Sequence, residues 1–409
     1  MYCCWLSAVA DHSIAQSLVV IFTILTVSSM SKKRFLGQPT TPTETLFFLT
    51  QKKVSDLKVE TMADTTQRTL TLAQLGWRPF FQRQLSLEQW DYPAVRVVAQ
   101  HRNRLELLGR DSQLQLDLNP NMPAITVGDW LLLTPESQFA QLLERQSLFR
   151  RKAAGSKAAE QLIAANVDTL FIVTSLNNDF NLNRIERYLS LANEAGVEPV
   201  VILSKADLCD DPDSFSREIQ TLDPLLMVKT MNGLDPNEIH KLAPWCDTGK
   251  TIALMGSSGV GKSTLVNTLL SEDIQPTVGI REDDSKGRHT TTGRSLHLMR
   301  QGGLLLDTPG MRELQLADCE DGVSATFADI TSLASHCRFG DCQHGSEPGC
   351  AVQHAIAQGE LERRRLASFQ KLTREQALNS ATLAEKRAKD KSFGKLVRAH
   401  QSYKRHRKG

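Results

Sequence analysis

A glycine-rich loop between residues 256 and 264 is the part of the chain with the clearest chemistry. The loop consists of Gly256, Ser257, Ser258, Gly259, Val260, Gly261, Lys262, Ser263 and Thr264. It fits the pattern G-x-x-x-x-G-K-[ST], in which backbone N–H groups and a helix N-terminus surround phosphate oxygens. In that pattern the lysine reaches the β- and γ-phosphates and the serine hydroxyl binds Mg²⁺. The loop therefore predicts a nucleoside triphosphate site, with Lys262 as a catalytic residue and Ser263 as a magnesium ligand.

A second motif, Ser204-Lys205-Ala206-Asp207, indicates which base is bound. It resembles the guanine-reading N/T-K-x-D signature of GTPases. The Asp207 carboxylate can accept hydrogen bonds from N1–H and the 2-amino group of guanine, a pair that adenine lacks. The stem of Lys205 can cover the face of the base. Alone this motif is weak, because a lysine and an aspartate after a strand are common in solvated loops.

A third motif follows the apolar run 304–306 and has the form D-x-x-G, with Asp307 and Gly310. We expect Asp307 near Mg²⁺ and the Gly310 N–H near the γ-phosphate. All three motifs follow an apolar run, and a turn of glycines and serines alone would not explain that combination. Together they favour GTP over ATP.

The surrounding pattern predicts an α/β domain, with strands that alternate with helices around a mostly parallel sheet. The predicted strands are Val167–Val173, Pro199–Leu203, Leu225–Val228, Thr251–Met255 and Leu304–Leu306. The predicted helices are Leu182–Ala195, Ser214–Thr221, Asn237–Leu242 and Ser263–Leu270, and the first of these is capped by Asn181 and ended by Gly196. The base motif precedes the phosphate loop, the reverse of the order in Ras-like GTPases. We therefore predict a circularly permuted GTPase domain, which is feasible because the termini of compact domains often lie close together.

The polar stretch 287–293 lies between the phosphate loop and the D-x-x-G motif. We expect Thr291 to close over Mg²⁺ when the γ-phosphate is present and assign it a catalytic role. Met311 stands where Ras-type enzymes carry the water-orienting glutamine, so intrinsic hydrolysis should be slow. His289 is a candidate catalytic residue that could position the water, although a solvated loop histidine is an equally good interpretation.

A cluster of metal-binding residue types follows, with the spacing C-x₄-C-x-H-x₅-C. Its members are Cys337, Cys342, His344 and Cys350. Three thiolates and one imidazole suit a closed tetrahedral zinc site, which is typical of structural zinc. The alternative is a set of reduced cysteines without a metal.

The remaining segments have other patterns. Short alternating runs between residues 70 and 150 predict a small β-barrel, and a five-stranded oligonucleotide-binding barrel (OB-fold) fits the length; a generic β module is the alternative. Phe149 to Lys152 reads as the start of a basic linker. The first sixty or so residues include an apolar stretch, 18–27, that is too short to span a bilayer. A disordered or wrongly assigned start, a membrane-associating segment and a real structural element remain open for them.

The C-terminus is strongly basic, with ten Lys and Arg and one acidic residue, Asp390, from Lys386 to Lys408. This segment carries +9 and the whole chain +2, so the rest carries −7. A solvated tail is one interpretation, and contact with a phosphate backbone is the one we favour. We predict the following organisation: 1–69 extension, 70–150 OB-fold barrel, 151–318 permuted GTPase domain, 319–385 α-helical zinc-binding domain and 386–409 basic tail.

The barrel, the permuted motifs G-S-S-G-V-G-K-S, G-R-H-T-T-T and D-T-P-G-M-R-E, and the metal spacing together resemble the RsgA (YjeQ) family over residues 70–409. The resemblance implies a cytoplasmic, ribosome-stimulated GTPase that acts late in maturation of the 30S subunit and contacts 16S rRNA. It also implies GTP and GDP binding through Ser204–Asp207 and Gly256–Thr264, with Mg²⁺, and one structural Zn²⁺. We expect a monomer without stable membrane association. The alternative is a nucleotide-dependent RNA-binding assembly factor with little turnover.

Two departures from the family pattern bear on the nucleotide site. Ser204 stands where the family often has asparagine, so a hydrogen bond from the base loop to the phosphate loop is in doubt. The segment Met227–Asn232 lacks the S-A motif of a fifth GTPase loop, so the sequence assigns no contact to guanine O6.

Overall fold

The computed structural model describes residues 70–152, 160–177, 179–270, 294–307, 311, 314 and 319–380. All of these described residues belong to one compact unit of the chain. The apolar stretch 18–27, the loop residues His289 and Thr291, the D-x-x-G glycine Gly310 and the basic tail 386–409 lie outside the described residues.

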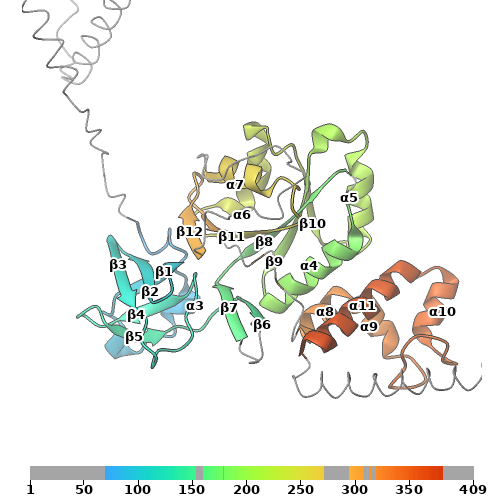
Figure 1. Cartoon of the computed structure of the whole chain (residues 1–409), viewed down its shortest axis with the longest axis horizontal. Coiled ribbons are helices and arrows are strands. Elements are labelled where there is room, and N and C mark those ends of the chain that lie inside the picture. Colours follow the sequence, from blue (N-terminus) through green and yellow to red (C-terminus); the bar gives the residue numbers. More distant parts are fainter. Residues whose placement is uncertain are drawn as a thin grey trace, which may run out of the picture. The chain divides into compact units, whose positions relative to one another are not determined.

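An antiparallel five-stranded sheet, called the meander below after its first three strands, forms the first described part (Figure 1). Its strands are β1 (Ala94–Gln100), β2 (Arg104–Gly109), β3 (Ser112–Asp117), β4 (Trp130–Leu133) and β5 (Phe139–Leu142). They pair in the order β3-β2-β1-β4-β5. Two short helical turns precede them, α3 (Pro79–Gln82) and η1 (Leu87–Gln89). The predicted run of short strands is confirmed.

The central strands β1 and β4 are buried on both of their faces. Because successive side chains point to opposite faces of a strand, Val95 and Val97 pack with Leu131 on one face of the sheet. Trp130 faces the other way and packs under Phe81 of the segment that precedes β1. This segment therefore acts as a cover for the second face.

The central part is an α/β layer in which five strands are parallel. Its strands are β8 (Thr169–Ser175), β9 (Glu198–Ser204), β10 (Met227–Thr230), β11 (Thr251–Met255), β12 (Arg294–Leu298) and β13 (Leu304–Asp307). They lie in the order β10-β9-β8-β11-β13-β12, and only β12 runs antiparallel to its neighbour β13. The phosphate-loop strand β11 thus lies inside the sheet, between β8, which precedes it in the chain, and β13, which follows it. The predicted circular permutation of a GTPase fold is confirmed.

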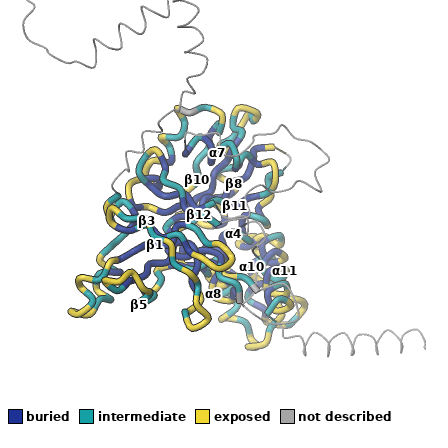
Figure 2. The backbone as a smooth tube through the Cα atoms, turned by 60° about the vertical axis from the view of Figure 1, so that its left-hand side comes forward, coloured by how far each residue is buried: buried dark blue, intermediate teal, exposed yellow. Residues whose placement is uncertain are grey.

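Helices cover both faces of this layer. They are α4 (Leu182–Ala195), η2 (Ala206–Leu208), α5 (Pro212–Gln220), η3 (Pro236–Leu242), α6 (Ala243–Cys246) and α7 (Lys262–Leu270). The side chains of β8 alternate between the two faces: Leu170 and Ile172 pack toward α4, whereas Phe171 and Val173 pack toward α6 and α7. Figure 2 shows β8 and β11 buried along most of their length.

Helix α4 has the ends that the sequence predicts. The side chain of Asn181 accepts a hydrogen bond from the N–H of Arg184 and caps the first turn. Gly196 ends the helix with φ of 70°, a left-handed conformation that glycine adopts at low cost. Both caps fix where α4 begins, directly after β8.

Three predictions for elements need correction. The supposed basic linker at Phe149 is part of a strand, β6 (Leu148–Lys152), which pairs with β7 (Glu160–Ala165). Phe149 is buried there, so an apolar residue in the basic run was the missed strand signal. Strand β10 begins two residues later than predicted, and residues 236–242 form a 3₁₀ helix.

The two sheets join edge to edge. Strand β12 pairs antiparallel with β1 through Ala99 opposite Ser295 and Gln100 opposite Arg294, so that the meander and the α/β layer form one 11-stranded sheet. Arg294 also donates a hydrogen bond to the carbonyl of Leu162 in β7 at 2.5 Å. Nothing in the sequence predicted this junction.

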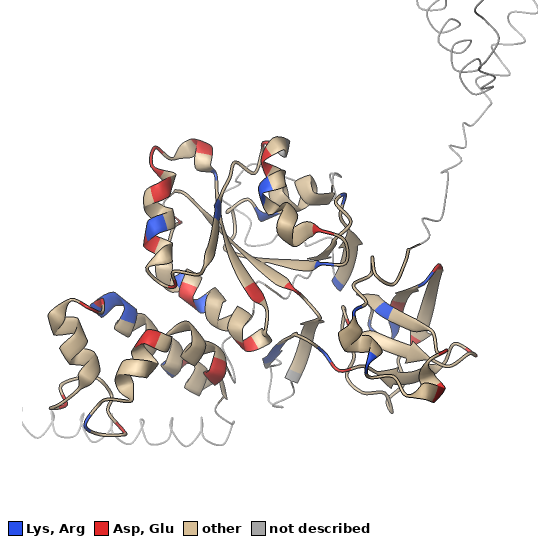
Figure 3. Cartoon of the chain, turned by 180° about the vertical axis from the view of Figure 1, so that it is seen from behind, with Lys and Arg blue, Asp and Glu red and all other residues tan. Residues whose placement is uncertain are grey.

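The last described part is helical, as predicted. It contains α8 (Glu320–Thr326), α9 (Ala328–Ala334), α10 (Ala351–Gln358) and α11 (Arg363–Ser380). Its apolar residues Val323 and Phe327 share a core with α4. Charged side chains of both signs are distributed along these helices and along α4 and α5 (Figure 3). Among the described residues, no helix has the length and apolar character needed to cross a membrane.

Candidate functional site

The phosphate loop connects the buried strand β11 with α7, as the sequence predicts. Gly256, Gly259 and Gly261 have φ values of 155°, 81° and 95°. A Cβ atom on Gly256 would lie 2.2 Å from the carbonyl oxygen of Val173, so this position cannot accept a side chain without moving β8. Glycine is therefore required here both by conformation and by space.

Lys262 begins α7 and is only 7% exposed. Its ammonium group donates hydrogen bonds to the carbonyl of Gly256 at 2.8 Å and to the carbonyl of Ser257. The lysine thus folds back over the start of its own loop. This places its charge inside the curve of the loop, where phosphate oxygens bind in this motif.

The base motif follows β9, two strands from β11 in the same sheet. Lys205 has a left-handed conformation (φ 59°), and the turn η2 begins directly after it. The Ser204 hydroxyl lies 2.6 Å from the carbonyl oxygen of Val260 in the phosphate loop and 3.2 Å from that of Thr174. The doubt about this position is thereby settled, because the serine hydroxyl donates to the phosphate loop without an amide.

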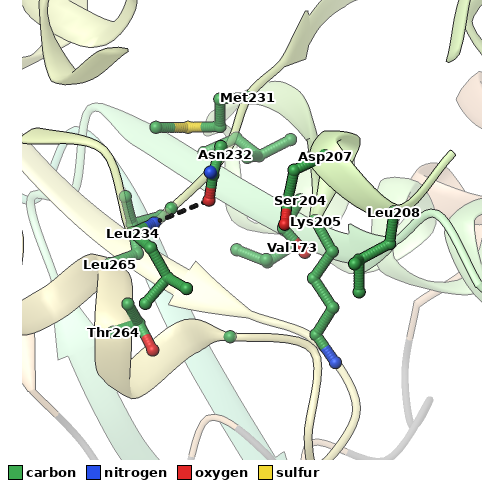
Figure 4. A pocket seen from close by; sticks show the side chains of 13 residues that line it. Val173, Ser204, Lys205, Asp207, Leu208, Met231, Asn232, Leu234, Thr264 and Leu265 are labelled. Atoms are coloured by element: carbon green, nitrogen blue, oxygen red, sulfur yellow. Dashed lines mark hydrogen bonds between the residues drawn. The ribbon is translucent and has the colours of Figure 1, made fainter. Parts of the chain in front are cut away.

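A pocket of about 210 Å³ lies between the base motif and α7 (Figure 4). It is lined by Val173, Ile202, Ser204, Lys205, Asp207, Leu208, Met231, Asn232, Gly233, Leu234, Gly261, Thr264 and Leu265. Figure 4 shows Lys205 and Asp207 on one side and Thr264 and Leu265 opposite them. The volume is smaller than the roughly 300–1,000 Å³ of pockets that enclose a whole drug-sized ligand. It suits one flat part of a larger ligand.

Eight of the lining residues were not predicted as site residues, and four of them are the consecutive residues 231–234. They follow β10 and form a turn in which Asn232 Oδ1 accepts from the N–H of Leu234 at 3.0 Å. The N–H of Asn232 donates to the Glu238 carboxylate at 2.8 Å. The signal that could have found this turn is the Asn-Gly pair after a strand, because these residues are typical of tight turns.

Glu238 holds the turn from η3. Partial burial alone would raise its pKa, but the hydrogen bonds from Lys241 and from the N–H of Asn232 outweigh that effect and lower it. The carboxylate is therefore ionised at neutral pH and keeps its two donors.

The third motif is described only in part. Asp307 ends β13, which pairs in parallel with β11, with Leu306 opposite Ala253, so this residue lies at the edge of the sheet where the phosphate loop begins. Met311 is 2% exposed and packs in the core shared with α4. A buried thioether cannot orient water, in agreement with the expectation drawn from the sequence. Gly310, His289 and Thr291 lie outside the described residues.

The predicted metal ligands come together in the helical part. One ligand atom from each of Cys337, Cys342, His344 and Cys350 lies within 4.8 Å of all the others. Cys337 Sγ is 3.9 Å from Cys350 Sγ and 3.7 Å from His344 Nδ1. His344 has φ of 57°, an uncommon conformation that turns its ring toward the thiols.

The thiols of this cluster differ in acidity. Burial would raise the pKa of Cys337, but hydrogen bonds from the N–H groups of Val352 and Ala351 lower it. The N–H of His344 lowers the pKa of Cys342, yet burial and the two neighbouring thiols raise it to about 11. Thiols that compete for protons in this way are the donor set that a cation stabilises as thiolates.

Comparisons with known proteins agree with these features. The model of a family described as RsgA GTPase matches residues 142–317. A relative from Vibrio parahaemolyticus, named Small ribosomal subunit biogenesis GTPase RsgA 2, is 60% identical over 86% of this chain and 98% of its own. Small ribosomal subunit biogenesis GTPase RsgA from Mesorhizobium japonicum is 48% identical over 77% of this chain and 92% of its own. The crystal structure of YjeQ from Thermotoga maritima superposes with a TM-score of 0.52 and 26% identity, over 68% of this chain and 96% of that one.

Proposed function

This chain belongs to the RsgA family of GTPases, and we propose that it uses GTP hydrolysis in late maturation of the small (30S) ribosomal subunit. The observation that carries the proposal is the pocket between the base motif, the turn 231–234 and α7, next to the phosphate loop. A guanine base in that pocket would leave its phosphates at the N-terminus of α7.

In this arrangement Asp207 accepts from N1–H and the 2-amino group of guanine, and the Lys205 stem covers the base. The proposed GTP-binding residues remain those of the three motifs: Ser204 to Asp207, Gly256 to Thr264, Asp307 and Gly310. The residues that would hold Mg²⁺ are Ser263 and Thr291. Magnesium neutralises charge on the phosphates when it is bound.

We retain Lys262, Thr291 and His289 as proposed catalytic residues. Met311 is buried and stands where Ras-type enzymes carry the water-orienting glutamine. The lack of this glutamine supports slow intrinsic hydrolysis. Contact with the ribosomal particle would then raise turnover.

The Cys337–Cys350 cluster is proposed to hold one structural zinc ion. The four donors suit tetrahedral zinc, and they leave no position for a substrate. The strand order of the meander, with β1 paired to both β2 and β4, supports an OB-fold that contacts 16S rRNA. The basic tail 386–409 would add phosphate contacts, and a cytoplasmic monomer fits such a role.

The decisive experiment measures GTP turnover by the full chain with and without purified 30S subunits. We expect strong stimulation that is lost in Lys262→Ala, because this variant removes the phosphate-binding ammonium group. GTP binding with no stimulation would instead favour an RNA-binding assembly factor with little turnover. Failure to bind GTP at all would refute the assignment of the pocket.

A further inference from the structure

Arg184, in the first turn of α4, reaches the phosphate loop. Its Nη1 donates a hydrogen bond to the hydroxyl of Ser257, the second residue of that loop. The same nitrogen donates to the Asp179 carboxylate at 2.7 Å and to the Asp179 carbonyl at 3.3 Å. None of the nucleotide motifs in the sequence includes Arg184.

Two cations meet at Ser257. The Lys262 ammonium donates to its carbonyl oxygen, and the Arg184 guanidinium donates to its hydroxyl. The lysine of this motif reaches the β- and γ-phosphates, and the Arg184 guanidinium contacts the same residue of the loop as that lysine.

The fold explains why these groups meet. Strands β8 and β11 are parallel neighbours, with Met255 opposite Ile172. Their carboxyl ends therefore lie at the same edge of the sheet, and α4 and the phosphate loop begin there. The Asn181 cap fixes the first turn of α4, so the position of the Arg184 backbone is set by rigid elements.

The side chain of Arg184 is held only loosely in its present position. Arg184 is 35% exposed and Asp179 30% exposed in their ion pair. Pairs with such exposure contribute about 0–1 kcal/mol. Asp179 Oδ2 is buried without a hydrogen-bond partner, so the carboxylate holds the guanidinium through one oxygen only. A phosphate group that carries more charge can take over this guanidinium.

We propose that Arg184 is a catalytic residue of the GTPase reaction, an arginine supplied by the chain itself that contacts the γ-phosphoryl group in the transition state. This inference rests on the GTPase function and phosphate-loop placement given above. GTPases stabilise this transition state with an arginine that either their own chain or a partner supplies. The buried Met311 supplies no polar group of its own, which makes a cationic side chain from another element more important.

GTP hydrolysis at this site requires no proton transfer to or from Arg184. The oxygen of water forms a bond to the γ-phosphorus, and the bond from this phosphorus to the β–γ bridging oxygen breaks. GDP leaves with the electron pair of that bond, and the protons of the water pass to inorganic phosphate and solvent. Arg184 donates hydrogen bonds to oxygens whose negative charge grows, and it stays protonated throughout.

The test compares Arg184→Ala and Arg184→Lys with wild type and with Arg187→Ala in the full chain. Arg187 lies three residues after Arg184 in α4. It pairs with Glu375 of α11 and serves as the matched control. For Arg184→Ala we expect kcat to fall by about 10²–10³-fold, the usual effect of removing one transition-state donor. Affinity for GDP with aluminium fluoride should fall by a similar factor, while affinity for GDP alone stays within about threefold. Arg184→Lys should recover only part of the loss, because it lacks the planar fork.

A purely structural role gives a different result. Equal losses of affinity for GDP and for GDP with aluminium fluoride would overturn the proposal, as would an unchanged kcat in Arg184→Ala. Addition of millimolar guanidinium should restore part of the turnover of Arg184→Ala and none in Arg187→Ala. If the wild-type chain neither binds nor hydrolyses GTP, the proposed function fails instead, so the two failures are distinct.

Discussion

At the scale of single residues, Ser204 shows how a motif can keep a hydrogen bond to the phosphate loop when its first residue is substituted. Asparagine and serine differ in reach, yet the serine hydroxyl lies 2.6 Å from the Val260 carbonyl and joins the base loop to the phosphate loop. The residue is only 5% exposed, so a lost bond would leave the carbonyl of Val260 without this donor in a dry environment. The identity of the first motif residue matters less than the presence of a donor there.

We predict that Ser204→Ala weakens GDP binding by about fivefold, which corresponds to about 1 kcal/mol for one hydrogen bond. Isothermal titration calorimetry with GDP measures the effect. Ser214→Ala is the matched control, because its hydroxyl donates to Asp211 near the exposed start of α5. Equal GDP affinity in Ser204→Ala and wild type would show that this hydrogen bond contributes nothing to the pocket.

The same scale shows what a sequence can reveal about a site. The phosphate loop and the cysteine cluster were readable because their chemistry needs particular residues at short, fixed spacing. The turn 231–234 was not assigned, because it contributes to the pocket partly through its backbone, and many side chains can build such a turn. Arg184 was missed for another reason: its partner Ser257 is far away in the chain, and only the pairing of β8 with β11 brings them together.

At the scale of elements, a buried ionic network attaches the C-terminal helices to α4. Glu186 of α4 is fully buried and accepts hydrogen bonds from Arg364 and Arg365 of α11. Arg365 also pairs with Asp329 of α9 at 2.5 Å. Burial alone would lower the pKa of Arg365. Its hydrogen bonds and charge contacts with Asp329 and Glu186 outweigh burial and raise the pKa, so the arginine stays charged.

We predict that Arg365→Met destabilises the protein by about 3–5 kcal/mol, the usual cost of removing one partner from a buried ion pair. Thermal unfolding followed by circular dichroism measures this change. The variant should keep its GDP affinity, because the base pocket contains no residue of α11. Arg374→Ala is the control, since its guanidinium donates to the Gln370 carbonyl on an exposed face of the same helix. A melting temperature equal to that of wild type would contradict the role of the network.

Metal removal tests the cluster between α9 and α10. A strong chelator should withdraw one zinc ion per chain and leave three thiols competing for protons, so the segment 337–358 should lose protection from hydrogen exchange. The α4 contacts of α8 should persist, because they depend on apolar residues such as Val323 and Phe327. Elemental analysis of the purified chain combined with hydrogen exchange gives the measurement. A chain with no bound zinc, or an exchange pattern that the chelator leaves unchanged, would count against a structural metal.

Elements were predictable where their signal is local. The strands around the phosphate loop and α4 with its caps followed from apolar periodicity and capping residues. Strand β6 was mistaken for a linker because three basic residues hide the single buried Phe149. Such a strand is defined by its partner β7 more than by its own composition.

At the scale of the molecule, the pairing of β12 with β1 makes one continuous sheet from two folding patterns. This pairing uses backbone groups of residues 99–100 and 294–295, and backbone groups leave no mark on a sequence. Strand β12 also pairs with β13, which ends at Asp307 of the D-x-x-G motif. A path of hydrogen-bonded strands therefore runs from the nucleotide site into the meander that we propose contacts rRNA.

The last prediction follows from that path. GDP binding stabilises the folded conformation of the nucleotide site. Local openings that break the strand pairing between this site and the meander therefore become rarer when GDP is bound. We expect amide exchange in β1 and β12 to slow on addition of saturating GDP, although neither strand lines the pocket. Exchange in β3, at the far edge of the sheet, should change much less. Hydrogen-exchange mass spectrometry on the full chain, with and without GDP, resolves these peptides.

Arg294→Ala provides the control for this coupling. Its guanidinium donates hydrogen bonds to the Leu162 carbonyl of β7 and to the Gln100 side chain of β1, so this side chain connects β12 with both strands. Burial at this junction lowers the pKa of Arg294. The variant should bind GDP like wild type, because Arg294 is absent from the pocket, but slowing of exchange in β1 should diminish. If GDP slows exchange in β1 equally in both proteins, the junction is a passive contact. If it slows exchange in neither, the meander and the nucleotide site are energetically independent despite their shared sheet.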